Sequence, residues 1–153
     1  MARRLTFALS SLIIRNTGIL FNGSDCLASK GIIYSRIYKE GKYLDIYNTH
    51  LDSGNSKCDI KTREHQLNFL SEYISKTSSK YPVIVCGDFN INYKKNSFLI
   101  DEFINELNLQ SHSNLKTNTV DYIFYRDSKD LKLDVIQENT EIDDSLHYLS
   151  DHK

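Results

Sequence analysis

Three short clusters of polar side chains in this 153-residue sequence have the types and spacing that hydrolytic chemistry needs. They are Asn48–His50, Gly87–Asn90 and Ser150–His152. Carboxylate and amide oxygens are the ligands that Mg²⁺ prefers, and a histidine beside a carboxylate can activate a water molecule. Together these groups are typical of metal-assisted hydrolysis.

The cluster Gly87–Asn90 carries the most information about geometry. Its glycine permits a sharp exit from a buried strand, after which alternation should send Asp88 and Asn90 to the same side. Asp121, at the start of a later strand, could accept a hydrogen bond from the imidazole N–H of His152 and hold its tautomer. Asp151 would offer a hard oxygen ligand next to that base.

Each of these motifs also has an ordinary structural interpretation. Gly-Asp-x-Asn after a strand is often a simple turn, and Thr-His-Leu often contains a strand-end histidine with satisfied hydrogen bonds. A terminal Ser-Asp-His can be a solvated tail. What favours function is that all three clusters follow predicted strands, because α/β proteins build their sites at strand ends.

Hydrophobic periodicity predicts alternating strands and helices that would position these clusters. Gly31–Ile37 and Tyr43–Asn48 flank a turn at Gly41 and indicate a β-hairpin. Pro82 precedes a continuous apolar run that is typical of a strand covered on both faces. The remaining predicted elements are a helix from about Ile60 to Ser75, the strand Val83–Cys86, a helix at Phe98–Leu107, and strands at Val120–Tyr125 and Leu131–Ile136.

Length and composition indicate one folded domain, and the alternating strands and helices make its class α+β (α/β). The net charge of -1 provides no global positive field for nucleic-acid binding. The three cysteines lack CxxC spacing, which argues against a zinc site or a disulfide scaffold. The apolar stretch Leu5–Ile14 weakly resembles a signal peptide, so cytoplasmic and secreted locations both stay open. No segment approaches the roughly 20 apolar residues of a membrane-spanning helix.

The order and spacing of these motifs resemble the endonuclease/exonuclease/phosphatase superfamily. The segment Asp25–Gly31 resembles neutral sphingomyelinases in particular, and the similarity extends to about His152. The motifs that carry the resemblance are Lys30-Gly31, Thr49-His50-Leu51, Arg63 with Gln66, Pro82 to Asn90, Asp121-Tyr122-Ile123 and Ser150-Asp151-His152.

The resemblance implies part of a four-layer α/β/β/α sandwich of the deoxyribonuclease I-like type, with the site where the loops of two sheets meet. His50 would hydrogen-bond the phosphate, and Asp88 would position the nucleophile or protonate the leaving oxygen. Asn90 would bind a phosphate oxygen or the metal. The reaction implied is in-line attack of water on a phosphodiester, with Mg²⁺ neutralising developing charge.

The same resemblance assigns roles to the C-terminal cluster. His152 would be the general base or would stabilise the transition state, with Asp121 orienting its ring. Asp151 would lie close to the metal, so the implied metal ligands are Asp151, Asp88 and Asn90. Which group takes the proton of the nucleophile differs among the mechanisms of this superfamily.

Two departures from the superfamily pattern shape our expectations. Residues 1–24 contain no glutamate, although the family carries its principal Mg²⁺ ligand upstream of the Lys-Gly segment, and the family continues beyond Ser-Asp-His. We therefore expect residues 1–153 to form a single incomplete phosphodiesterase domain with an uncertain or divergent start at 1–24. Weak Mg²⁺ binding, weak or absent hydrolysis, and pairing with a missing N-terminal half would follow.

A phospholipid is the expected phosphodiester substrate, as in a sphingomyelinase or phospholipase C. The segment Arg126–Leu149 is short and mostly charged, unlike the aromatic membrane-contacting hairpin of bacterial sphingomyelinases. Two alternatives therefore stay open, namely a Mg²⁺-dependent nuclease of the same superfamily and a non-catalytic remnant.

Overall fold

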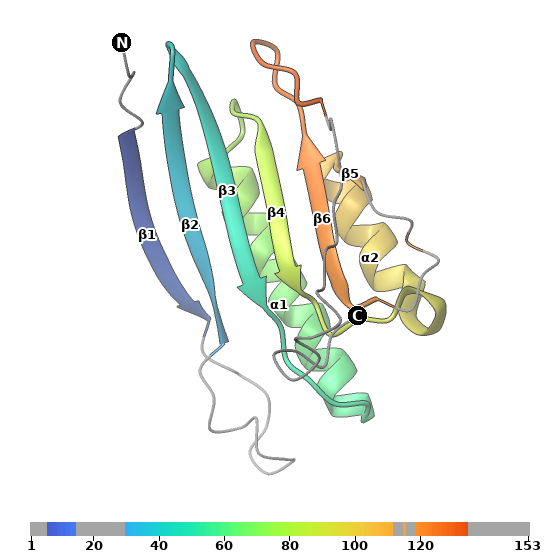
Figure 1. Cartoon of the computed structure of the whole chain (residues 1–153). Helices are drawn as coiled ribbons and strands as arrows, with labels where there is room; N and C mark the ends of the chain where they lie inside the picture. Colours follow the sequence, from blue (N-terminus) through green and yellow to red (C-terminus); the bar gives the residue numbers. More distant parts are fainter. Residues whose placement is uncertain (1–5, 15–29, 112–114, 116–118, 135–153) are drawn as a thin grey trace, which may run out of the picture.

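The computed structural model describes residues 6–14, 30–111, 115 and 119–134, which form one mixed β-sheet and two helices. The strand order is β1-β2-β3-β4-β6-β5, and both helices cover the same face of the sheet (Figure 1). The elements are β1 (Thr6–Ile14), β2 (Lys30–Lys39), β3 (Lys42–His50), α1 (Lys57–Thr77), β4 (Val83–Asp88), α2 (Tyr93–Leu107), β5 (Gln110–Ser111) and β6 (Asp121–Arg126).

Strands β2 and β3 form the predicted antiparallel hairpin. The turn consists of Glu40 and Gly41, whose φ angles of 53° and 83° are both positive, as a tight two-residue hairpin turn requires. Strand β3 then pairs in parallel with β4, and α1 makes the connection between them. Both β3 and β4 therefore end at the same edge of the sheet.

The core lies between the sheet and the two helices. Alternate residues of β2, β3, β4 and β6 point toward the helices, while Ile33 and Ile123 on the opposite face are 51% and 47% exposed. The largest buried apolar side chains of the core are Tyr47, Tyr122, Phe89, Phe103, Phe124, Ile32, Leu51, Leu70, Ile74, Ile91 and Ile100.

Helix α1 begins with a capping box. The side chain of Ser56 accepts a hydrogen bond of 3.2 Å from the backbone N–H of Asp59, and the Asp59 carboxylate accepts one of 2.7 Å from the backbone N–H of Ser56. This reciprocal pair satisfies two donors that the first turn of a helix otherwise leaves free.

Replacing Ser56 with alanine is expected to lower the free energy of unfolding by about 1 kcal/mol, because the Asp59 N–H loses its acceptor. Urea denaturation followed by circular dichroism measures the change. Ser79, which is exposed in the turn after the helix, provides a matched Ser→Ala control that should leave stability nearly unaltered. Equal effects of the two substitutions would show that the cap contributes nothing.

A buried carboxylate organises the end of the sheet opposite to the ends of β3 and β4. Asp45 is fully buried and accepts two hydrogen bonds of 2.7 Å from the guanidinium of Arg36, one from the hydroxyl of Tyr34 and one from the hydroxyl of Ser78. Burial and the neighbouring Asp45 carboxylate raise the pKa of Tyr34 well above its usual range. The phenol of Tyr34 is therefore a permanent donor to this network.

Replacing Asp45 with asparagine is expected to reduce the free energy of unfolding by about 2 kcal/mol, since one of the hydrogen-bond acceptors becomes a donor and Arg36 loses its counter-charge. Thermal and urea unfolding of the variant measure the loss. Asp130→Asn, at an exposed position, is the control. A variant as stable as the parent would contradict this account of the network.

Two predictions of secondary structure need correction, and one strand was not predicted. Strand β1 lies within the apolar stretch Leu5–Ile14 and pairs antiparallel with β2. Helix α2 begins at Tyr93 instead of Phe98, and non-helical angles at Asn96 explain why the helical period is hard to detect before that point. The predicted strand Leu131–Ile136 is wrong over 131–134, which contain no strand.

Side-chain hydrogen bonds explain the absence of a strand at 131–134. The backbone N–H of Leu131 donates to the hydroxyl of Ser128, and that of Leu133 donates to the carboxylate of Asp127. Local side-chain acceptors thus take donors that a sheet would use, and the chain forms a turn. Residues 135 and 136 lie outside the described part of the chain.

The α+β fold class is confirmed. The described residues form one sheet and the helical layer on one of its faces. These are two of the layers of the predicted four-layer sandwich. Neither of the two described helices is long and apolar enough to cross a membrane.

Candidate functional site at the ends of strands β3 and β4

The sheet brings three of the predicted site residues to one edge. In the strand register, His50 of β3 is opposite Asp88 of β4, and Asp88 is opposite Asp121 of β6. Strands β3 and β4 end at this edge, whereas β6 runs in the opposite direction and begins there (Figure 1). A histidine and two carboxylates from distant parts of the sequence therefore lie side by side.

His50 and Asp88 are in direct electrostatic contact. The Nε2 atom of His50 lies 3.4 Å from Oδ2 of Asp88, and the two side chains are 59% and 13% exposed. The imidazole thus reaches solvent while the carboxylate is largely sheltered by protein. A protonated imidazole would form an ion pair with Asp88 and would present positive charge to an incoming anion.

The turn that carries Asp88 depends on two unusual backbone conformations. Gly87 has a φ angle of 134°, and a Cβ atom at this position would overlap the carbonyl oxygen of Thr49. Asn90 has a φ of 52°, in the left-handed region that asparagine tolerates better than most residues. The backbone N–H of Asn90 donates to Asp88 Oδ1 over 2.8 Å, which closes an Asx turn. The ordinary turn that was the alternative interpretation of Gly-Asp-x-Asn therefore exists, and it also presents the carboxylate.

The amide of Asn90 connects this turn to the loop that follows β3. Its Nδ2 atom donates to the carbonyl oxygen of Leu51 over 3.1 Å and to Asp88 Oδ2 over 3.3 Å. Both partners are acceptors, so hydrogen-bond chemistry identifies the donor atom as nitrogen. The amide oxygen is left out of these contacts, and it is the atom that could bind a cation.

An aromatic cluster supports the turn from the core side. Phe89 is fully buried, and its ring packs edge-on against Phe103, Tyr122 and Phe124 at centroid distances of 5.3 to 5.9 Å. The hydroxyl of Tyr122 donates to the carbonyl oxygen of Ile91 over 2.7 Å. Sequence reasoning missed this support, although the Phe inside Gly-Asp-Phe-Asn and the Tyr after Asp121 were visible signals.

Asp121 is held at the start of β6 by a local cap, because its backbone N–H donates to the hydroxyl of Thr119 over 3.0 Å. The partner that the sequence assigns to it, His152, lies outside the described residues, and so does Asp151. Contact between Asp121 and His152, and coordination of a metal by Asp151, therefore stay predictions.

The described residues fit a magnesium site only in part. The Asp88 and Asp121 carboxylates and the Asn90 amide oxygen are hard oxygen donors of the type that Mg²⁺ selects. Within the described ranges, however, no group of three or more His, Cys, Asp and Glu side chains is arranged to hold a metal ion. A metal site that includes these residues would therefore need further donors from outside the described ranges.

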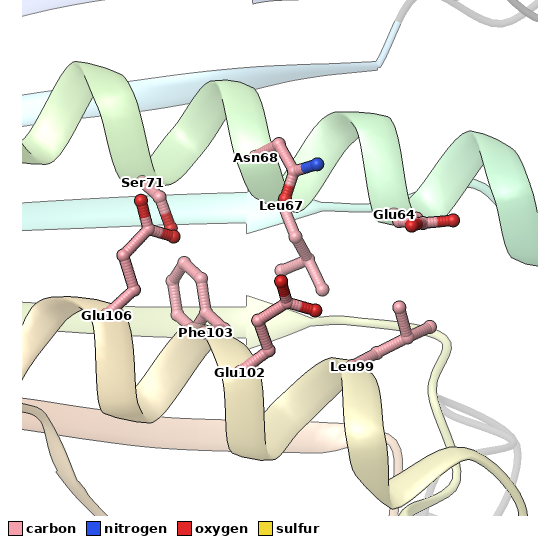
Figure 2. A pocket seen from close by; sticks show the side chains of 8 residues that line it. All are labelled: Glu64, Leu67, Asn68, Ser71, Leu99, Glu102, Phe103 and Glu106. Carbon is pink, nitrogen blue, oxygen red and sulfur yellow. The ribbon is translucent and has the colours of Figure 1, made fainter.

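A surface hollow between α1 and α2 is separate from this site. Figure 2 shows its side chains, in which two leucines and a phenylalanine lie among three glutamates. None of the predicted site residues lines it. Its lining consists of Glu64, Leu67, Asn68, Ser71, Leu99, Glu102, Phe103 and Glu106.

Comparison with known sequences gives sphingomyelinases and phospholipases C among the matches. No protein-family model matches the chain. Sphingomyelinase C 2 of Leptospira interrogans is 29% identical over 127 residues, which cover 74% of this chain and 20% of the relative. Phospholipase C of Staphylococcus aureus is 33% identical over 76 residues, which cover 46% of this chain and 23% of the relative. The chain thus spans about a fifth of the length of these relatives.

Solved structures share the fold. SmcL superposes with a TM-score of 0.62 at 23% identity, covering 76% of this chain and 48% of that one. An endonuclease/exonuclease/phosphatase from Beutenbergia cavernae gives 0.61 at 14% identity, covering 80% and 38%. A variant β toxin of Staphylococcus aureus with bound magnesium ions gives 0.55 at 27% identity, covering 76% and 50%.

The chain therefore has the fold of the endonuclease/exonuclease/phosphatase superfamily, as its sequence motifs predicted. Within that superfamily its sequence relatives are sphingomyelinases and phospholipases C, which confirms the resemblance to the sphingomyelinase-like branch.

Proposed function

We propose that this chain is a phosphodiester hydrolase domain whose site lies at the ends of β3 and β4. The observation that carries the proposal is the alignment of His50, Asp88 and Asp121 across three neighbouring strands. One imidazole and two carboxylates at a sheet edge combine an anion-binding group with acid and base groups, which is what hydrolysis of a phosphodiester requires.

Each of the three aligned site residues has a role in the proposed reaction. His50, which is exposed to solvent, hydrogen-bonds a non-bridging phosphate oxygen. Asp88, sheltered and held by the Asn90 backbone N–H, positions the attacking water or protonates the leaving oxygen. Asp121 orients the imidazole of His152, which acts as general base or stabilises the transition state.

Magnesium is part of the proposal. Asp88, Asn90 and Asp151 are the residues that would hold it, and when bound it neutralises charge on the phosphoryl oxygens. The presence of magnesium ions in the variant β toxin structure supports this choice of cation. Nδ2 of Asn90 donates to Asp88 Oδ2 over 3.3 Å, so these two side chains are already adjacent.

We infer that the substrate is a phospholipid, because the sequence relatives are a sphingomyelinase and a phospholipase C. The nearly neutral net charge of -1 also disfavours the nuclease alternative, since nucleic-acid binding gains most of its affinity from basic side chains. The expected pairing with a further N-terminal segment stays a prediction. The exposed apolar side chains Ile33 and Ile123, opposite the helices, agree with it.

Parallel assays on two substrates test the function. The chain is incubated with sphingomyelin vesicles and with supercoiled plasmid, each with Mg²⁺ and with EDTA. Slow release of phosphocholine that requires Mg²⁺ is the expected result, because residues 1–24 contain no glutamate to act as the principal Mg²⁺ ligand. Nicking of the plasmid without phosphocholine release would replace the lipid substrate with DNA, and the absence of both products would support the non-catalytic alternative.

A further inference from the structure

A buried arginine lies beneath the loop that follows His50. Arg63, on α1, is only 1% exposed, and its Nη1 atom donates to the carbonyl oxygens of Asp52 and Gly54 over 3.0 and 2.9 Å. One helical turn later, Oε1 of Gln66 accepts a hydrogen bond of 2.9 Å from the backbone N–H of Asp52. Two side chains of one helix therefore bind three backbone groups of the loop.

The opposite side of the same loop is bonded to the candidate site. The backbone N–H of Leu51 donates to the carbonyl oxygen of Asp88 over 2.9 Å, and the carbonyl oxygen of Leu51 accepts from Asn90 Nδ2. Leu51 and Asp52 are consecutive. The loop is therefore held between α1 on one side and the Asp88 turn on the other, and His50 directly precedes it in the sequence.

Burying a guanidinium here is unfavourable for stability. Burial lowers the pKa of Arg63, an effect that the Asp59 and Asp52 carboxylates oppose. The Nε atom of Arg63 and the Nε2 atom of Gln66 have no hydrogen-bond partner among the described residues. A leucine or methionine would fill such a position without this cost, so packing alone does not explain the choice of residues.

We propose that Arg63, together with Gln66, is a positioning residue of the phosphodiesterase site. Its hydrogen bonds to the carbonyl oxygens of Asp52 and Gly54 fix the position of the loop. Because Leu51 of this loop is bonded to Asp88 and Asn90, the loop in turn positions the Asn90 amide and His50 relative to Asp88. The proposal rests on the function proposed above. Arg63 acts through the backbone, so it need not touch substrate or metal.

The chain contains a matched control. Arg126, the last residue of β6, also donates to two backbone carbonyl oxygens, those of Leu107 and Ser78, each over 2.9 Å. Burial lowers its pKa as well. It lies at the opposite end of β6 from Asp121, so its removal should cost stability without reaching the candidate site.

The experiment compares Arg63→Met, Arg63→Lys and Arg126→Met with the unsubstituted chain. Amide hydrogen exchange measured by NMR reports the Leu51 and Asp52 N–H groups, which donate to Asp88 and Gln66. Exchange at Val85, in the centre of β4, provides the internal reference for global unfolding. Mg²⁺-dependent phosphodiester hydrolysis is measured on the same samples, with kcat and KM determined separately.

In Arg63→Met, exchange at Leu51 and Asp52 should rise at least about 10-fold relative to Val85, since local opening no longer breaks the Arg63 contacts. The kcat should fall about 10- to 100-fold with KM altered little, as expected for misplacement of reacting groups. Compared with Arg63→Met, Arg63→Lys should keep part of the exchange protection and part of kcat, because an ammonium group still donates to carbonyl oxygens. Arg126→Met should change neither the exchange of Leu51 and Asp52 relative to Val85 nor kcat.

Two results would overturn the positioning role. One is unaltered relative exchange at Leu51 and Asp52 in Arg63→Met. The other is an equal effect of Arg126→Met, which would mean that general destabilisation explains both. If the unsubstituted chain hydrolyses no phosphodiester, the proposed function fails while the exchange measurement still decides whether Arg63 holds the loop.

Discussion

Replacing Asp88 with asparagine is expected to reduce phosphodiester hydrolysis at least about 100-fold, because the site loses a group that transfers or orients a proton. The substitution keeps the shape of the side chain. An asparagine oxygen can still accept the hydrogen bond from the Asn90 backbone N–H, so the Asx turn should persist. What the variant loses is the negative charge opposite His50 and the second acceptor for Asn90 Nδ2.

The comparison needs a control that separates chemistry from stability. Asp101→Asn removes a carboxylate of α2 that accepts a hydrogen bond of 2.8 Å from the Tyr93 hydroxyl, away from the site. Hydrolysis rates at saturating Mg²⁺ and urea midpoints are measured for both variants. We expect similar midpoints and a loss of rate only for Asp88→Asn. Full activity of Asp88→Asn would remove this residue from the mechanism.

Replacing Gly87 with alanine is expected to lower the free energy of unfolding by at least about 3 kcal/mol, since it combines backbone strain with a steric overlap between neighbouring strands. The φ angle of 134° lies in a region that residues with a Cβ rarely adopt. The added Cβ would also overlap the carbonyl oxygen of Thr49. Strands β3 and β4 would have to separate where His50 and Asp88 are paired.

Gly41 provides the matched comparison for this substitution. Its φ angle of 83° is also positive, but an added Cβ would meet no atom within 4 Å. Gly41→Ala should therefore cost only about 1 kcal/mol, the strain of the backbone alone. Urea denaturation of the two variants separates strain from steric overlap. Equal losses would show that the close approach of β4 to Thr49 has no energetic consequence.

Elements with strong local signals could be predicted from the sequence. The hairpin of β2 and β3 has a glycine turn between β-rich runs, α1 has apolar residues at helical spacing, and β4 is a β-branched run after a proline. Strand β1 could not be recognised, because a short apolar stretch has the same pattern in a signal peptide and in a strand. Its pairing with β2 is a non-local contact that no local pattern reveals.

The candidate site was partly predictable for a related reason. His50 and Asp88 each follow a hydrophobic run, so the sequence placed both at the ends of predicted strands. The parallel pairing of β3 and β4 brings them together in the structure. The role of Arg63 could not be deduced, since a charged residue within a helical pattern usually faces solvent. Only the structure shows that it is buried beneath the loop after His50.

A titration with Mg²⁺ and inorganic phosphate, followed through backbone amide chemical shifts, tests most directly whether one phosphate-sized site exists at this sheet edge. Binding should perturb the amides of His50, Asp88, Asn90 and Asp121 together, with a single affinity. The amide of Glu102, beside the hollow between the helices, should stay unperturbed. Shifts scattered over unrelated surfaces, or none at the four site residues, would contradict the assignment of a phosphodiesterase site.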